Sequence, residues 1–189
     1  EEIGVPYDLV QSTIDMNEPR PPEQLTINPN GWIPVLIGDV AIYEAAAITI
    51  YLCDQYPSAD LAPRPDQMTR GLFLQTLVYF SSSVQNAFQL NYYPDRFAET
   101  SDGYSGAMQR GIRRLRETWQ VIDTQIGAKQ WVLGHKFSAV DIYLFMLTTW
   151  LKDSRGHPSV QEFPSVARIA EKVLLRPATQ KVYGSSSVS

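Results

Sequence analysis

The spacing of hydrophobic and polar positions changes along the chain, and the first third shows short alternating runs. Alternation over residues 7–11 predicts a strand. Two further apolar runs, residues 35–37 and 40–43, are joined by Gly38-Asp39 and predict a β-hairpin with a primed turn. A polar, proline-rich stretch between the strand and the hairpin leaves room for a short helix over residues 23–26.

A helix is predicted directly after the hairpin. Residues 44–56 have helical spacing and several alanines, and Pro57 closes the segment. A strand, an irregular segment, a hairpin and a helix in this order indicate a small α/β unit.

The rest of the chain has the hydrophobic period of α-helices. Two apolar stripes with steps of three and four residues predict buried helix faces. The first stripe consists of Phe73, Leu77, Phe80, Val84 and Phe88, and the second of Ile112, Leu115, Trp119, Ile122 and Ile126.

A further helix is predicted over residues 139–152, and because it is apolar nearly all round, it should lie inside a bundle. Ser138 and Asp141 have the spacing of a capping box, with Asp in the place of the usual Glu or Gln. We expect this pair to be a structural cap, so its loss should impair folding first. Shorter helices are predicted over residues 165–174 and 177–182.

These elements predict two domains. The α/β domain covers residues 1–57, a proline-rich linker residues 58–66, an all-helical domain residues 67–183, and a disordered tail residues 184–189.

Composition narrows the class of protein. The 189 residues include 16 basic and 20 acidic side chains, a formal charge of −4, which argues against nucleic acid as a partner. The longest nearly apolar run, residues 142–151, is too short to span a membrane, and no signal-peptide pattern is visible. A single cysteine, Cys53, leaves no internal disulfide and fits the cytoplasm.

Ile33-Pro34 lies between a turn with proline and glycine and the first strand of the hairpin. A proline at a strand entry often marks a sheet edge, where the preceding residue can offer its backbone N–H and C=O to a peptide-like ligand. This segment resembles the glutathione-binding half of the glutathione S-transferase family, and the similarity covers nearly the whole chain. Its most specific parts are residues 28–36, 43–52 and 134–141.

The resemblance implies an α/β plus all-α fold, with a thioredoxin-like N-terminal domain followed by a glutathione-transferase-type helical bundle. We expect the thioredoxin-like domain to be incomplete, because the family's first strand and helix would precede Glu1. In the family, a Tyr or Ser hydroxyl from that region lowers the pKa of the glutathione thiol, or a Cys there forms mixed disulfides. The catalytic residue is therefore expected N-terminal of Glu1, and none is assigned in this chain.

The resemblance assigns the binding of glutathione, as co-substrate, to Ile33, Pro34, Glu44 and Ala45. In the family the proline is cis and the residue before it pairs with the cysteinyl part of glutathione, whereas the alternative is a trans proline in a structural turn. Glu44 would contact the γ-glutamyl end, or else only favour the helix dipole. The family usually has serine in place of Ala45, so one hydroxyl that binds this end is missing.

Three aromatic residues and one arginine complete the expected site. Trp32 either touches the ligand through its indole N–H or covers the hairpin or a partner subunit. Tyr92, Tyr93 and Arg96 are acceptor-site candidates, because aromatic faces suit apolar substrates and a guanidinium can hold an anion. The alternative is a helix-end cluster packed on the bundle.

The remaining candidates are expected to be inert. Cys53 lies among apolar neighbours of a predicted helix and should be a buried thiol. His135 and His157 stand alone in predicted loops, so the sequence supports neither a metal site nor a catalytic triad.

The leading hypothesis is a homodimeric enzyme that conjugates glutathione to an electrophilic, mostly apolar small molecule, as in detoxification. One alternative is a non-catalytic binding or interaction module of the same fold, which Ala45 favours. Another is glutathione-dependent reduction or ether cleavage on the same scaffold. No membrane, nucleic-acid or metal partner is expected.

Overall fold

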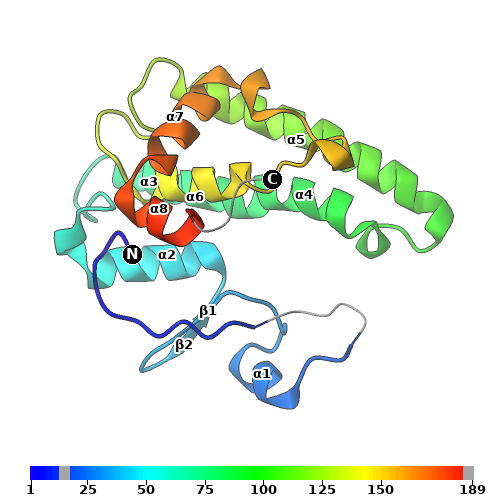
Figure 1. Cartoon of the computed structure of the whole chain (residues 1–189), viewed down its shortest axis with the longest axis horizontal. Coiled ribbons are helices and arrows are strands. Elements are labelled where there is room, and N and C mark those ends of the chain that lie inside the picture. The colour runs from blue at the N-terminus through cyan, green and yellow to red at the C-terminus, as the bar shows by residue number, and fades with distance from the viewer. Residues whose placement is uncertain (13–17, 185–189) are drawn as a thin grey trace.

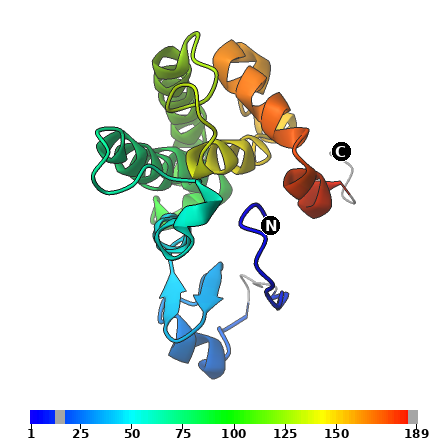
Figure 2. The ribbon, with the colours of Figure 1, turned by 90° about the vertical axis from the view of Figure 1, so that its left-hand side faces the viewer.

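The computed structural model describes residues 1–12 and 18–184 and shows a small α/β part beside a larger helical bundle (Figure 1). The α/β part contains α1 (Pro22–Ile27), β1 (Val35–Ile37), β2 (Ala41–Tyr43) and α2 (Ala45–Gln55). In the turned view, α2 lies between the hairpin and the bundle (Figure 2). The two-part fold class predicted from the sequence is confirmed. The predicted loop over 16–22 and the predicted tail over 184–189 fall partly outside the described residues.

The hairpin is present, but its turn differs from the predicted one. The antiparallel register places Val35 opposite Tyr43, so Gly38, Asp39 and Val40 form a three-residue loop. A primed turn needs a positive φ angle at its first central residue, and neither Gly38 nor Asp39 has one. The Gly38 N–H instead donates to the Val40 carbonyl at 3.2 Å, which removes Val40 from the strand.

The strand predicted over residues 7–11 is wrong. Within the described part of the chain, the sheet pairs β1 with β2 alone, and residues 7–11 form no ladder with either strand. Alternation predicts a strand only where a neighbouring strand takes up the backbone N–H and C=O groups. Leu9 and Val10 are accordingly 75% and 83% exposed.

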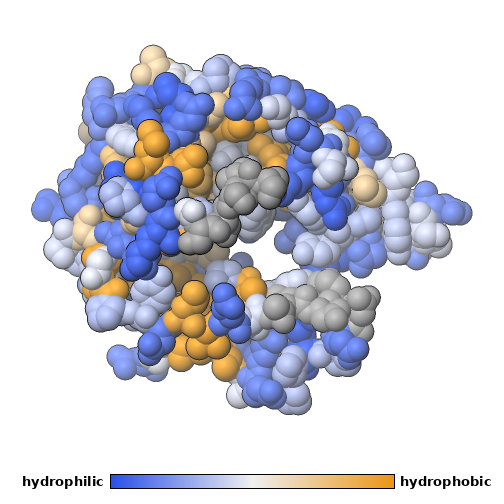
Figure 3. Space-filling model, in the orientation of Figure 1, coloured by the Kyte–Doolittle hydropathy of each residue, from blue (hydrophilic) through white to orange (hydrophobic). Residues whose placement is uncertain are grey.

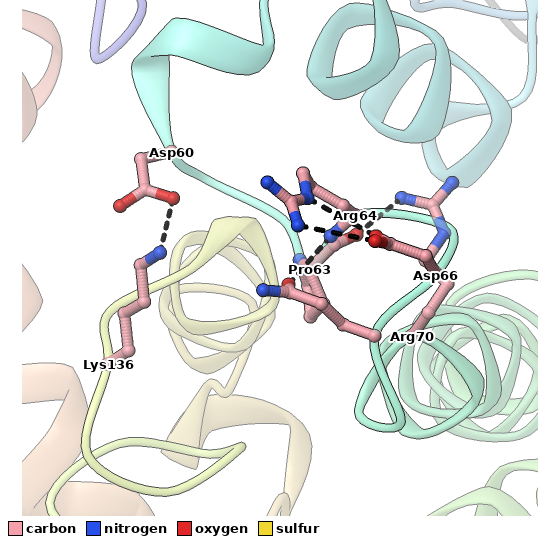
Figure 4. A network of polar contacts seen from close by, with 7 residues as sticks. Asp60, Pro63, Arg64, Asp66, Arg70 and Lys136 are labelled. Atoms are coloured by element: carbon pink, nitrogen blue, oxygen red, sulfur yellow. Dashed lines mark hydrogen bonds and ion pairs between the residues drawn. The ribbon is translucent and has the colours of Figure 1, made fainter.

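Arg70 ties α2 to the bundle at the start of α3 (Arg70–Tyr79). Its guanidinium donates to the Asp54 carboxylate at 3.0 Å and to the Pro63 carbonyl at 3.1 Å, and the second contact is drawn in Figure 4. The Arg70 side chain is only 12% exposed, so the charges are partly shielded from water. In the same view, Lys136 forms an ion pair with Asp60, near the N-terminal end of the linker over residues 58–66. These contacts fix the segment that joins the two parts.

The first long helix of the bundle is interrupted by a π-helical turn. It consists of α3, the π-helical turn η2 (Phe80–Val84) and α4 (Gln85–Tyr92). The residues predicted as its apolar stripe, Phe73, Leu77, Phe80, Val84 and Phe88, are all buried. The next helix, α5 (Tyr104–Ile126), crosses α4 closely at Gly111, where a Cβ atom would lie 2.9 Å from the carbonyl oxygen of Ala87.

The central helix α6 (Ala139–Thr148) begins where predicted and ends four residues earlier than predicted. The hydroxyls of Thr148 and Thr149 donate to the carbonyls of Phe145 and Met146, at 2.7 Å each, and the chain turns away after them. Side-chain bonds of this kind compete with the helical pattern, which explains the early end. The helices α7 (Pro164–Leu174) and α8 (Pro177–Tyr183) complete the bundle. The 3₁₀ turns are η1 (Pro57–Ala59), η3 (Pro94–Arg96), η4 (Ser101–Gly103), η5 (Asp153–Arg155) and η6 (Val160–Glu162).

The predicted capping box at the start of α6 is confirmed. The Asp141 carboxylate accepts hydrogen bonds from the backbone N–H of Ser138 and of Val132, both at 2.8 Å, and from the Ser138 hydroxyl at 3.0 Å. Asp141 is fully buried, and this burial raises the pKa of its carboxyl despite the three hydrogen bonds. One side chain therefore joins α6 to the loop before it.

Residues 1–12 and 18–184 contain neither a candidate membrane span nor a candidate metal cluster. No helix there combines the length and apolar character needed to cross a membrane. No group of three or more His, Cys, Asp or Glu side chains lies in an arrangement that could hold a metal ion.

Candidate functional site

A cleft of about 470 Å³ lies between the α/β part and the helical bundle. The molecular surface is visibly hollowed between the two parts (Figure 3). The cleft brings together every binding residue proposed from the sequence: Trp32, Ile33, Pro34, Glu44, Ala45, Tyr92, Tyr93 and Arg96. The first five residues come from the α/β part. The last three come from the segment that leads from the end of α4 into η3, so the two groups of residues line the same cleft.

The Ile33–Pro34 peptide bond is cis, as the sequence predicted. Ile33 is 49% exposed, and within the described residues its N–H and C=O make no hydrogen bond. An unpaired N–H and C=O on one residue at the wall of a cleft form a donor and acceptor pair that suits an extended peptide.

Asn28 holds the segment before Ile33 in place. Its side chain is 2% exposed, donates to the Trp32 carbonyl at 2.8 Å and accepts from the Asn30 N–H at 3.0 Å. Gly31 follows with φ +67°, and a Cβ there would lie 2.6 Å from Cγ of Arg20. The Asn-Pro-Asn-Gly turn therefore sets the position of the Ile33 edge, a role that the sequence analysis did not assign to Asn28.

Glu44 is the residue before the first turn of α2, and it has an unusual backbone with φ +71° and ψ 110°. Positive φ angles are uncommon for a non-glycine residue and occur often at ligand sites. The first N–H to bond into α2 is that of Ile48, which donates to the Glu44 carbonyl at 2.9 Å. The preceding amides, including that of Ala45 at the cleft, have no partner among the described residues and suit a carboxylate.

Five aromatic rings line the cleft in series and form what we call the aromatic wall. Its members are Trp32, Tyr93, Tyr92, Phe88 and Trp150, with successive ring centroids 5.6–6.4 Å apart. The Tyr92 hydroxyl donates to the Trp150 carbonyl at 2.9 Å, which fixes the far end of the wall. Tyr92 and Tyr93, the aromatic acceptor-site candidates, both belong to the wall, and Phe88 and Trp150 extend it beyond the residues proposed from the sequence.

The charges of the lining are unevenly distributed. The guanidinium carbon of Arg96 lies 4.3 Å from the Trp32 ring centroid and 4.4 Å from that of Tyr93. Lys152 lines the cleft as a second cation, and Glu44 is the one acidic side chain among the described residues of its lining. The cleft therefore favours ligands that carry negative charge.

Gln85 and Tyr143 form a polar pair that the sequence analysis missed. Gln85, at the start of α4, lines the cleft, and its side-chain oxygen accepts a hydrogen bond of 2.6 Å from the Tyr143 hydroxyl. Burial, with a smaller effect from the charge of Glu44, raises the pKa of Tyr143 to about 12, so this hydroxyl keeps its proton. Because its oxygen is occupied, the Gln85 amide presents its N–H donors to the rest of the site. No spacing in the sequence links residues 58 positions apart, so this pair was not predictable.

His157 has a structural role that its isolated position in the sequence concealed. The ring is 5% exposed, its Nδ1 accepts from the Lys152 N–H at 3.1 Å, and its Nε2 lies 2.9 Å from Oδ1 of Asn91. The acceptor role of Nδ1 places the proton on Nε2. His157 therefore fastens the segment that carries Trp150 and Lys152 to α4.

The cysteine is inert as predicted. Cys53 is buried in α2, and burial, with the charge of Asp54, raises the pKa of its thiol to about 11. It lines a separate, mostly apolar pocket of about 360 Å³ between α2, α6 and α8, away from Ile33.

The chain is similar to known glutathione transferases along most of its length. Residues 106–177 match the family model described as the C-terminal domain of glutathione S-transferase. A glutathione S-transferase-like protein of Aspergillus terreus, gedE, is 24% identical over 96% of this chain and 85% of its own length.

Solved structures agree with the sequence comparisons. A sphingomonad glutathione S-transferase complexed with glutathione matches with a TM-score of 0.73 and 26% identity over 87% of this chain and 79% of its own. A Sulfitobacter glutathione transferase homologue with bound glutathione has a TM-score of 0.86 and 24% identity, and covers 97% of this chain and 88% of its own. Fold, cleft and comparisons agree: the chain is similar to glutathione S-transferases along most of its length, and its residues 106–177 match the C-terminal domain of that family.

Proposed function

We propose that this protein binds glutathione in the cleft and conjugates it to an electrophilic, mostly apolar small molecule. The observation that carries the proposal is the backbone edge of Ile33, unpaired within the described residues, at the wall of a cleft that also contains the first turn of α2. The glutathione named in the structure of the sphingomonad enzyme supports this ligand.

Two neighbouring residues of the tripeptide suit two different features of the cleft. The Ile33 N–H and C=O would pair with the cysteinyl residue, because both partners are backbone groups with one donor and one acceptor each. The γ-glutamyl carboxylate would accept from the amides at the start of α2, while Glu44 would hold the ammonium group beside it. Pairing of both residues would fix the cysteinyl side chain, and with it the sulfur, beside Ile33 in the cleft.

The reaction that this arrangement serves is nucleophilic substitution or addition. In a substitution, the glutathione sulfur forms a bond to an electrophilic carbon of the acceptor, the leaving group departs with its electron pair, and the thiol proton is released to solvent. In an addition, the displaced electron pair stays on the acceptor, which takes up a proton in place of the one that the thiol releases. The chain's own residues bind both reactants and hold them together, which lowers the entropic cost of their meeting. The aromatic wall excludes water from the apolar part of the acceptor. The proposal assigns no residue of this chain to lowering the pKa of the thiol.

The proposal keeps the expectations of a homodimer in the cytoplasm and of a role in detoxification. Ala45 favours one competing function, a binding module without catalysis, because it lacks the hydroxyl that a serine would give to the γ-glutamyl end.

A calorimetric titration combined with product analysis tests the proposal. The full protein is titrated with glutathione, and then incubated with glutathione and a chlorodinitroarene while the thioether is measured by mass spectrometry. We expect saturable binding and enzyme-dependent thioether. Binding without thioether from any electrophile tested would support the binding module, and no heat at millimolar glutathione would refute both functions.

A further inference from the structure

The acceptor end of the cleft combines aromatic rings with an exposed positive charge. The guanidinium carbon of Arg96 lies over the rings of Trp32 and Tyr93, 4.3 and 4.4 Å from their centroids. In the described part of the chain, no carboxylate lies within ion-pair distance of its guanidinium, although Asp95 is its neighbour in sequence. By contrast, Arg70 and Arg176 are paired with acidic side chains.

The position of Arg96 over these two rings decides which groups it can bind. A guanidinium held by cation–π contacts still carries its N–H groups in its own plane, where they can form a bidentate pair with a planar anion. The rings also limit the rotamer freedom of the side chain, so binding an anion there costs less entropy than at a free arginine.

The aromatic wall indicates what kind of molecule fits the part of the cleft next to Arg96. The rings run from Trp32 beside Arg96 to Trp150, and Lys152, two residues after Trp150, also lines the cleft, so the aromatic wall has a cation in the lining at each end. Glu44, the one acid that the described lining contains, belongs to the α/β part, whereas Arg96 and Lys152 belong to the helical part. An aromatic ligand with an acidic substituent therefore matches the surface better than a purely apolar ligand does.

We propose that the acceptor is an aromatic electrophile that carries a carboxylate, with its ring on the aromatic wall and its carboxylate held by Arg96. This inference rests on the proposed function and narrows its substrate class. Glutathione has carboxylates of its own, so the test separates Arg96 contacts to the acceptor from Arg96 contacts to glutathione.

The test uses two stable conjugates that differ in charge and hardly in shape. The para-nitrobenzyl and para-carboxybenzyl thioethers of glutathione carry planar groups of nearly equal size, and only the second is anionic. Their dissociation constants for the full protein are measured by calorimetry, together with that of glutathione itself. We expect the wild type to bind the carboxybenzyl conjugate about tenfold more tightly than the nitrobenzyl conjugate, as a charge-assisted pair requires.

Two variants test whether Arg96 causes the preference for the carboxybenzyl conjugate. Arg96→Gln should abolish the preference and leave the affinity for glutathione within about twofold, a difference too small to indicate a lost contact. Arg113→Gln removes the same charge from an exposed position of α5 that does not line the cleft, and it should keep the preference. This control separates a direct contact from a general effect of net charge.

Each other outcome overturns the inference. An equal affinity of the wild type for both conjugates, or a preference that survives in Arg96→Gln, would show that Arg96 does not select a carboxylate. An Arg96→Gln protein that loses glutathione as strongly as the carboxybenzyl conjugate would place the contact on glutathione. A wild type that binds glutathione but neither conjugate would refute the inference alone, whereas no binding of glutathione would remove the proposed function with it.

Discussion

The Tyr143 hydroxyl donates a hydrogen bond of 2.6 Å to the side-chain oxygen of Gln85 and so connects α6 with the wall of the cleft. Tyr143 is 5% exposed, whereas Gln85 is partly exposed and reaches the site. A buried group thus fixes the orientation of an amide that faces the cleft.

Tyr143→Phe should weaken glutathione binding about two- to tenfold, because the loss of one neutral hydrogen bond lets the Gln85 amide rotate. Calorimetric titration measures this change, and Tyr79→Phe is the matched control, since Tyr79 lies on α3 and does not line the cleft. Equal affinities of Tyr143→Phe and the wild type would show that the orientation of Gln85 does not matter for the ligand.

Ala45→Ser should strengthen glutathione binding at least about tenfold, because it supplies a hydroxyl to a charged carboxylate at the start of α2. Ala47→Ser makes the same chemical change two residues further along α2, at an exposed position outside the cleft, and should have no effect. If both serine variants bind like the wild type, the γ-glutamyl end does not lie at Ala45.

Asp141→Asn should lower the free energy of unfolding by about 2–4 kcal/mol, because an amide cannot accept all three hydrogen bonds in a buried position. Urea denaturation measures the loss, and Asp153→Asn, at an exposed position, should be nearly neutral. The folded fraction of Asp141→Asn should bind glutathione like the wild type. A loss of affinity without a loss of stability would contradict a purely structural role.

His157 should make the protein less stable in mild acid. Burial, together with the charge of Arg155, lowers the pKa of this histidine in the folded state below its usual value of about 6.5, while the carbonyl of Trp150 acts in the opposite direction. The unfolded chain therefore binds the proton more readily. The stabilisation is fully present above pH about 6.5 and is lost as the pH falls through the folded-state pKa, with a slope of at most about 1.4 kcal/mol per pH unit.

The measurement is the urea midpoint of the wild type and of His157→Asn between neutral pH and about pH 5, the range in which an ordinary histidine titrates. The asparagine of the variant cannot titrate there, so the difference between the two proteins should shrink as the pH falls. A pH-independent difference would contradict the account.

The sequence predicted the parts of the site that local chemistry determines. Ile33-Pro34, the hairpin and the start of α2 are adjacent in the chain, and the apolar stripe from Phe73 to Phe88 determines which helix face is buried. The strand over residues 7–11 was wrong because alternation describes the side chains and not the availability of a partner strand. The end of α6 depends on side-chain bonds of Thr148 and Thr149, which a hydrophobic pattern does not describe.

Contacts between residues far apart in the sequence could not be predicted from sequence patterns. The pairs formed by Gln85 with Tyr143 and by Asn91 with His157 join residues 58 and 66 positions apart, and neither the glutamine nor the histidine alone gave a signal. The role of Asn28 in holding the segment before Ile33 could have been predicted from the sequence. Asn-Pro-Asn-Gly is a recognisable turn in which an asparagine side chain accepts a hydrogen bond from the backbone N–H two residues on.

The central claim is that the backbone edge of Ile33 pairs with glutathione, and backbone amide NMR tests it most directly. The ¹⁵N-labelled protein is titrated with glutathione while the Ile33 amide is followed, with the amide of Ile37, an exposed residue of the hairpin, as a reference. The account predicts a saturable shift of the Ile33 amide and slower exchange of its proton with solvent, with little change at Ile37. A ligand that binds in the cleft and leaves the Ile33 amide unshifted and unprotected would contradict the account.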